Sequence, residues 1–179
     1  MKKTLTLSAA AAFGIAGSTM ARGLDIDISG LTSNGFQNAN DGNATIAVGL
    51  GVGFFITEIG YDINATGVGV SWFEEMTYSL WDGPVGGTLI ADGSSGALSY
   101  APGAQTSFFV NTTASGVHDI VDYMMTTDTL TIELHEWSFD DVVGPDAIYN
   151  EGSVLTIPIP APAGLAAIGV LGLVRRRLR

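Results

Sequence analysis

The central part of the sequence contains no basic residue that could neutralise its acids. Between residues 23 and 174 there are 18 Asp and Glu but no Lys or Arg, and the chain has no cysteine. Without cysteine, neither a disulfide framework nor a thiolate zinc site can form. The fold must therefore rest on its hydrophobic core. Each acid must be solvated, hydrogen-bonded, protonated or paired with a metal cation, because an unpaired buried charge is costly.

The basic residues are confined to the two ends of the chain. They are Lys2, Lys3 and Arg22 at the start and Arg175, Arg176, Arg177 and Arg179 at the end. If both ends are removed and Arg22 is kept, the remaining body has a formal charge of −17. Binding to nucleic acid or to anionic lipid relies on Lys and Arg, so the composition argues against both.

The first 21 residues have the three parts of a secretory signal peptide. Lys2 and Lys3 precede an apolar stretch from Leu5 to about Ala16, and small residues then lead to Ala21. We expect a signal helix that signal peptidase removes after Ala21. An uncleaved anchor or a buried helix is the alternative, but this apolar stretch is shorter than the roughly 20 residues of a membrane span.

The last 22 residues, 158–179, contain prolines, a short apolar run and an arginine cluster. The run from Ala163 to Val174 spans about 18 Å as a helix, whereas the hydrocarbon core of a bilayer is about 30 Å thick. Prolines at 158, 160 and 162 oppose a helical extension toward the N-terminus. We therefore expect a short hydrophobic helix, and a permanent tail anchor or a core helix remains the alternative.

This tail resembles the PEP-CTERM sorting signal of exopolysaccharide-producing Gram-negative bacteria. Pro160-Ala161-Pro162 takes the motif position, with Ala161 where the family's name-giving glutamate stands, and Arg175, Arg176 and Arg177 form the basic end. The resemblance implies transient association with the inner membrane and processing by an exosortase-like membrane protease. It also implies delivery to the cell surface or extracellular matrix, with exopolysaccharide as a possible partner.

The body between the two ends, residues 22–157, shows the pattern of an all-β domain. Alternating apolar and polar residues predict strands over 24–28, 59–64, 75–80 and 129–135. Shorter strands are expected near 45–49, 87–91, 107–110, 118–121 and 153–157, and the segments between them are rich in Gly, Asn, Asp and Pro. We predict an antiparallel β-sandwich of jelly-roll-like type. Parts of the body also resemble uncharacterised secreted proteins that carry the same tail.

The sequence offers one candidate metal site, for calcium. Asp140, Asp141 and Asp146 lie in the densest acidic stretch, and calcium binds carboxylate and carbonyl oxygens. The spacing does not follow the EF-hand pattern, so solvated turn carboxylates are the alternative.

No catalytic signature is evident, and we expect a structural or binding role. The two histidines, His118 and His135, are expected to be surface or structural residues. A secreted hydrolase acting on polysaccharide is the alternative, although the sequence does not identify its acidic pair. Glu133 with Glu136 is one candidate, whereas the adjacent Glu74 and Glu75 would point to opposite faces of a strand. Tryptophans at three positions could stack on sugars or belong to the core: Trp72, Trp81 and Trp137.

If the calcium site exists, added calcium should raise the melting temperature of the protein at constant ionic strength, because a ligand that binds only the folded state stabilises it. Thermal unfolding with calcium, and with a matched concentration of a monovalent salt, measures this effect. An unchanged melting temperature would contradict the calcium hypothesis.

Overall fold

The computed structural model describes residues 23–38, 42–68, 72–94, 96–100, 111–138 and 145–159. These ranges contain ten strands and one short 3-10 helix, so the prediction of an all-β protein with antiparallel sheets is confirmed. Residues Asp25–Ile157 form one compact unit. No helix within the described ranges has the length and apolar character needed to span a bilayer. The signal helix and the C-terminal helix expected from the sequence lie outside the described residues.

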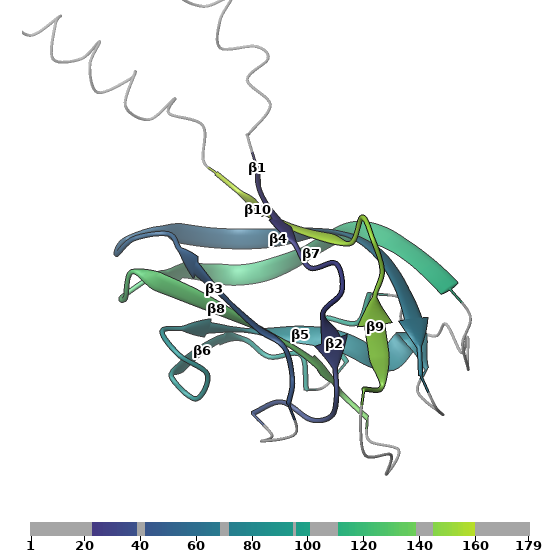
Figure 1. Cartoon of the computed structure of the whole chain (residues 1–179). Coiled ribbons are helices and arrows are strands. Elements are labelled where there is room, and N and C mark those ends of the chain that lie inside the picture. Colours follow the sequence, from purple (N-terminus) through teal and green to yellow (C-terminus); the bar gives the residue numbers. More distant parts are fainter. Residues whose placement is uncertain are drawn as a thin grey trace, which may run out of the picture. The chain divides into compact units, whose positions relative to one another are not determined.

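The first sheet is built around the long strand β4 (Figure 1). One edge of β4 pairs with β7, and its other edge is shared by β10 and β9. Beyond these two, β1 lies next to β10 and β2 next to β9. The six strands are β1 (Gly23–Asp27), β2 (Thr32–Ser33), β4 (Phe55–Gly67), β7 (Asn111–Met124), β9 (Ala147–Tyr149) and β10 (Val154–Pro158).

The second sheet has four strands in the order β3, β8, β5, β6, and all its pairs are antiparallel. It forms the lower layer in Figure 1, facing the first sheet. Its strands are β3 (Thr45–Gly49), β8 (Thr129–Glu136), β5 (Met76–Asp82) and β6 (Thr88–Ala91).

The core fills the space between the two layers. Ile59, Ile63 and Ala65 of β4 are fully buried at alternate positions, as expected of a strand with one face on a core. Across the interior, Tyr78 Oη of β5 donates to His118 Nδ1 of β7 at 2.9 Å, and the His118 ring stacks on Tyr61. These contacts join the inner faces of the two sheets.

The middle of the second sheet is covered on both faces. All seven residues of β5 are buried, as are seven of the eight residues of β8. One face packs on the core, and the other lies beneath segments outside the sheet. An antiparallel sheet commonly leaves one face to solvent, so a second sheet that is covered on both faces distinguishes this fold.

Several predicted strands agree with the structure, and others differ for identifiable reasons. The strand predicted at Thr45–Gly49 has the same bounds as β3, whereas the one predicted near His118–Val121 is only part of the 14-residue β7. The one predicted at 107–110 lies outside the described residues. Strands β2 and β9 have two and three residues, too few to show an alternating pattern.

The structure corrects one predicted strand boundary, at Glu75. The sequence pattern starts a strand at this residue, but the structure places it at the end of the 3-10 helix η1 (Phe73–Glu75). Its carboxylate accepts a hydrogen bond from the backbone N–H of Trp72 at 2.9 Å. This local bond stabilises a turn in place of an extended backbone.

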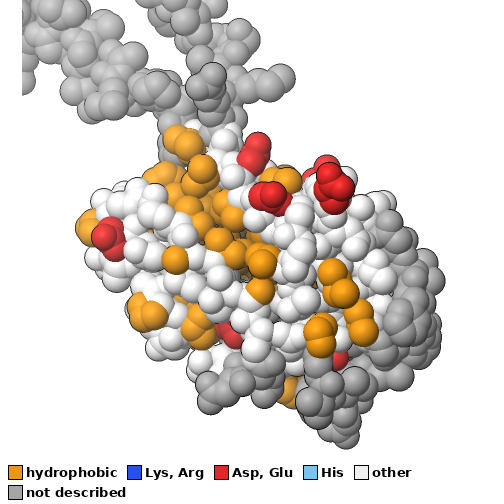
Figure 2. Space-filling model, viewed as in Figure 1, with side chains coloured by type: hydrophobic (Ala, Val, Ile, Leu, Met, Phe, Trp, Pro, Cys, Tyr) orange, Lys and Arg blue, Asp and Glu red, His pale blue; other side chains and the backbone are white. Residues whose placement is uncertain are grey.

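The surface of the described residues carries acids without basic partners (Figure 2). Among these residues, four carboxyl groups are at most 3% exposed. They belong to Asp82, Glu133, Glu136 and Asp146. No Lys or Arg occurs between residues 23 and 174, so their environment has to stabilise them by other means.

Asp82 shows how such a group is accommodated. Its carboxylate accepts hydrogen bonds from the backbone N–H and the hydroxyl of both Thr126 and Thr127, and from Tyr123 Oη at 3.0 Å. Burial alone would raise the pKa of Asp82, but the bonds from Thr126 and Thr127 outweigh it and hold the pKa well below its usual range. The charged carboxylate therefore fixes the turn between β7 and β8.

Replacing Asp82 with Asn should lower the free energy of unfolding by about 2 kcal/mol at neutral pH, because the amide nitrogen would face buried donors. Because the pKa of Asp82 is depressed in the folded protein, its carboxylate contributes stability at pH values above the ordinary pKa of 3.8. This contribution is lost as the pH falls below 3.8. The difference in free energy of unfolding between wild type and Asp82→Asn should therefore become smaller in acid. Urea unfolding as a function of pH measures it.

Asp128→Asn is the matched control, because Asp128 lies on the same turn and is exposed. It should change the free energy of unfolding by less than about 0.5 kcal/mol. Equal losses in the two variants at neutral pH would contradict the assigned role of Asp82.

Candidate functional site

The outer face of the β5–β8 pair carries polar side chains although it is buried. Strand β8 pairs with β5 in a register that sets Thr77 opposite His135 and Ser79 opposite Glu133. All four residues are at most 1% exposed. We call the residues of this face the polar layer: Thr77, Ser79, Trp81, Thr131, Glu133 and His135.

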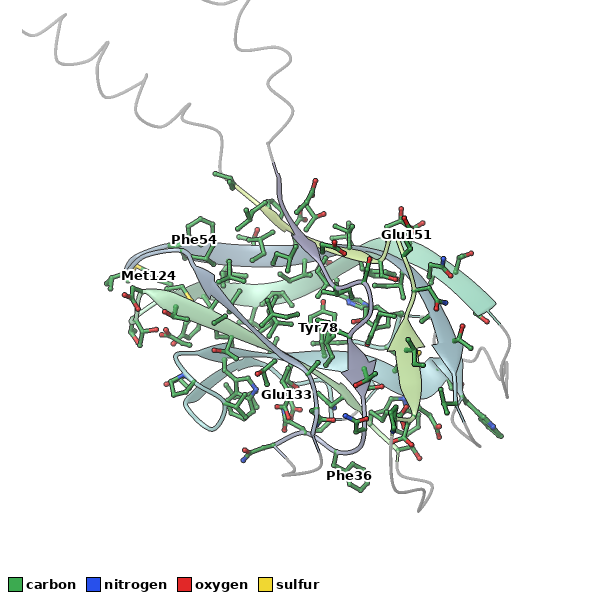
Figure 3. All side chains as sticks on the ribbon, in the orientation of Figure 1. Phe36, Phe54, Tyr78, Met124, Glu133 and Glu151 are labelled. Atoms are coloured by element: carbon green, nitrogen blue, oxygen red, sulfur yellow. The ribbon has the colours of Figure 1, made fainter. Side chains whose placement is uncertain are left out.

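Glu133 holds one of the covering segments on the polar layer. Its Oε1 accepts from the backbone N–H of Asn38 at 2.7 Å and from Asn43 Nδ2 at 3.1 Å. Its Oε2 accepts from the indole Nε1 of Trp81 at 3.2 Å. In Figure 3, Glu133 lies on the lower side of the second sheet, whereas Tyr78 points between the layers. Three N–H donors thus stabilise this carboxylate without a cation.

Ser79 and His135 form a hydrogen-bonded pair within the same layer. His135 Nδ1 lies 3.0 Å from the backbone carbonyl oxygen of Glu136, which can only accept, so Nδ1 carries the proton. In the neutral ring, Nε2 is then the acceptor, and Ser79 Oγ donates to it at 2.7 Å. This is the arrangement of a hydroxyl next to its general base.

Two further groups donate to the Ser79 hydroxyl oxygen. The backbone N–H of Gly93 donates at 3.1 Å, and the carboxamide Nε2 of Gln37 donates at 2.6 Å. The same nitrogen of Gln37 also donates to Asp92 Oδ1 at 3.2 Å. Ser79 therefore joins both covering segments, the one around Gln37 and the one around Asp92 and Gly93, to the sheet.

Burial keeps the His135 ring neutral. It lowers the pKa of His135 below its ordinary value, although the bond to the Glu136 carbonyl and the nearby carboxylates of Glu133 and Asp92 oppose this shift. Ser79 and His135 are both fully buried. An external substrate cannot reach the hydroxyl in this arrangement.

The acidic pair considered for a hydrolase does not come together. Glu133 belongs to the polar layer, and Glu136, three residues further along β8, faces the interior. There, burial raises the pKa of Tyr149, and the carboxylate of Glu136 adds to the shift although a bond to Tyr100 opposes it. The two carboxylates thus lie on opposite faces of one strand.

The proposed calcium ligands are described only in part. Asp146 is fully buried, and its backbone N–H donates to the carbonyl oxygen of Ser33 at 2.9 Å. Asp140 and Asp141 lie outside the described residues. Within the ranges that the structure describes, no three His, Cys, Asp or Glu side chains gather closely enough to hold a metal ion. The calcium site stays a prediction, as do the sorting residues 160–162 and 175–177, which also lie outside.

The three tryptophans have different environments. Trp81 is 6% exposed and belongs to the polar layer, so it offers no surface for stacking on a sugar. Trp137 and Trp72 are half-buried. The indole N–H of Trp137 donates to the Glu74 carbonyl at 2.7 Å, and its ring lies against Gly96.

Sequence reasoning does not identify Gln37, Ser79 or Asp92 as members of a site. Gln37 and Ser79 are 42 residues apart, and Ser79 and His135 are 56 apart, so no local motif contains them. The available signal is the presence of polar residues at alternate positions of two strands whose other faces are apolar. That signal also fits a solvent-exposed face.

Comparison with protein-family models, with curated proteins and with solved structures gives no match to this chain. The functional argument therefore rests on the residues and their geometry.

Replacing Gly93 with Ala should destabilise the protein by about 3 kcal/mol, because an added Cβ would overlap the carbonyl oxygen of Tyr78 and press on Thr77 Oγ1. Thermal or urea unfolding measures the loss. Gly49→Ala is the control, since a Cβ at Gly49 meets no atom within 4 Å. If the two variants unfold alike, the segment around Gly93 does not pack on β5 as described.

Proposed function

We propose that this chain is a secreted, exosortase-processed protein of the cell surface or extracellular matrix, with a structural or binding role linked to exopolysaccharide or biofilm. Its working part would be the acidic β domain, a β-sandwich of jelly-roll-like type formed by the two facing sheets. Signal peptidase would remove residues 1–21. An exosortase-like membrane protease would then act near Pro162 while residues 163–174 hold the chain transiently in the inner membrane.

The observation that carries the proposal is the enclosed polar layer. The reactive groups that the structure describes there, the Ser79 hydroxyl and the His135 ring, are fully buried and bonded to segments that cover the sheet. Such an arrangement supports a role in holding the fold together. The end of β10 at Pro158, just ahead of the Pro160-Ala161-Pro162 motif, further supports a domain followed directly by a sorting segment.

The hydrolase alternative receives no support from the described carboxylates. A glycosidase needs two carboxyl groups on either side of one bond of the substrate. Glu133 and Glu136 face opposite sides of β8, and Glu74 and Glu75 belong to a short turn in which Glu75 bonds to the chain itself.

Intact-mass spectrometry of the native protein, cell-bound and released, tests the processing. We expect the mature chain to begin at Arg22 and to lack the residues after about Pro162, because the arginine cluster and the short helix would direct cleavage. Replacing Arg175, Arg176 and Arg177 with Gln should leave the tail attached. A mature wild-type chain that still ends at Arg179 would contradict exosortase processing and favour a permanent anchor.

A further inference from the structure

The Ser79 hydroxyl lies between a base and a carboxamide. His135 Nε2 accepts its proton at 2.7 Å, and on the other side Gln37 Nε2 lies 2.6 Å from Oγ. The carboxamide carbon of Gln37 is bonded directly to that nitrogen. Because a carboxamide carbon–nitrogen bond is about 1.3 Å long, this carbon lies no more than about 4 Å from the hydroxyl oxygen. A buried nucleophile and a buried base thus meet a half-buried electrophile.

We propose that Ser79 and Gln37 form an intramolecular ester cross-link, with His135 as the general base and with ammonia as the only product released. This inference goes beyond the proposed function. It concerns a self-modification of the folded domain, whatever the destination of the protein.

The reaction balances without any added reagent. As Ser79 Oγ forms a bond to the Gln37 carboxamide carbon, its proton passes to His135 Nε2. The carbon–nitrogen bond of the resulting tetrahedral intermediate then breaks, and the departing nitrogen takes the proton from His135. A hydroxyl and a carboxamide become an ester and ammonia, and His135 returns to its neutral form.

The surroundings favour this step in three ways. The hydrogen bond from His135 Nδ1 to the Glu136 carbonyl keeps Nε2 free of a proton and aimed at Ser79. The N–H of Gly93 donates to Ser79 Oγ and holds the hydroxyl oxygen in position between His135 and Gln37. Asp92 Oδ1 accepts from the Gln37 nitrogen and so stabilises that nitrogen as it gains a proton. Each of these groups is already in place before the reaction.

Folding supplies the proximity and the dryness that the reaction needs. Holding two reacting groups together raises their effective concentration to roughly 10⁵–10⁸ M in well-oriented cases. Ser79 and His135 are fully buried and Gln37 is half-buried, so the nucleophile and its base are shielded from bulk water.

The cross-link would give the domain a covalent constraint that it cannot obtain from disulfide bonds. The chain has no cysteine, so no disulfide can join the segment around Gln37 to the sheet. An ester between Gln37 and Ser79 closes a loop of about 40 residues and restricts the unfolded chain as a disulfide does.

Intact-mass spectrometry of the denatured full chain tests the proposal. After its termini are assigned, wild type should weigh about 17 Da less than its sequence requires, the mass of one ammonia. Ser79→Ala, Gln37→Ala and His135→Gln should each have their full sequence mass. Ser115→Ala, at an exposed position of β7, should show the same deficit as wild type.

Peptide mapping locates the bond and separates it from other losses of ammonia. Because no Lys or Arg occurs between residues 23 and 174, cleavage at acidic or aromatic residues replaces trypsin. We expect one linked pair of peptides containing Gln37 and Ser79, and we expect alkaline hydroxylamine to split it. An asparagine succinimide would also lose ammonia, but it would link no peptides and would persist in Ser79→Ala.

Two results would overturn the inference. One is a folded wild-type chain that still has its full sequence mass after several days of incubation. The other is a mass deficit that remains in Ser79→Ala. Neither result depends on whether residues after about Pro162 are removed, so a failure of this inference is distinguishable from a failure of the proposed function.

Discussion

Two buried carboxylates, those of Asp82 and Glu133, are stabilised without Lys or Arg, and that constraint organises much of the described structure. Asp82 is surrounded by the N–H and hydroxyl groups of Thr126 and Thr127, and Glu133 by three N–H donors. Hydrogen bonds to the charged form replace the missing cations. Thr126 lies 44 residues from Asp82 in the sequence, and Asn38 lies 95 residues from Glu133. Each acid therefore also links segments that are distant in the sequence.

The same requirement explains why the second sheet has two covered faces. Its inner face is mostly apolar, apart from groups such as Glu136 and the Tyr78 hydroxyl, and it packs on the first sheet. Its outer face presents the polar layer to segments that run over it. Most buried polar groups are hydrogen-bonded, and here the covering segments contribute Gln37, Asn38 and Gly93 as partners of Ser79 and Glu133. The result is a hydrogen-bonded network that joins the covering segments to the sheet.

The sequence predicts the strands well where one face meets the core and the strand is long enough to show alternation. Strand β3 has the bounds that its pattern predicts, and β8 differs by one residue at its end. It does not predict β2 and β9, which form because neighbouring strands offer them hydrogen-bond partners. The full length of β7, from Asn111 to Met124, likewise follows its pairing with β4 rather than the short stretch of alternation near 118–121.

For the site, the sequence by itself determined which residue types are available. The body has Asp and Glu but no Lys or Arg, it has no cysteine, and polar residues occupy alternate positions of two strands. The sequence could not determine which of those polar residues meet. Period-two alternation states which side chains share a face, but not which strand lies alongside or what covers that face. Only the register of β8 against β5, together with the segments folded over both, brought Gln37, Ser79 and His135 into contact.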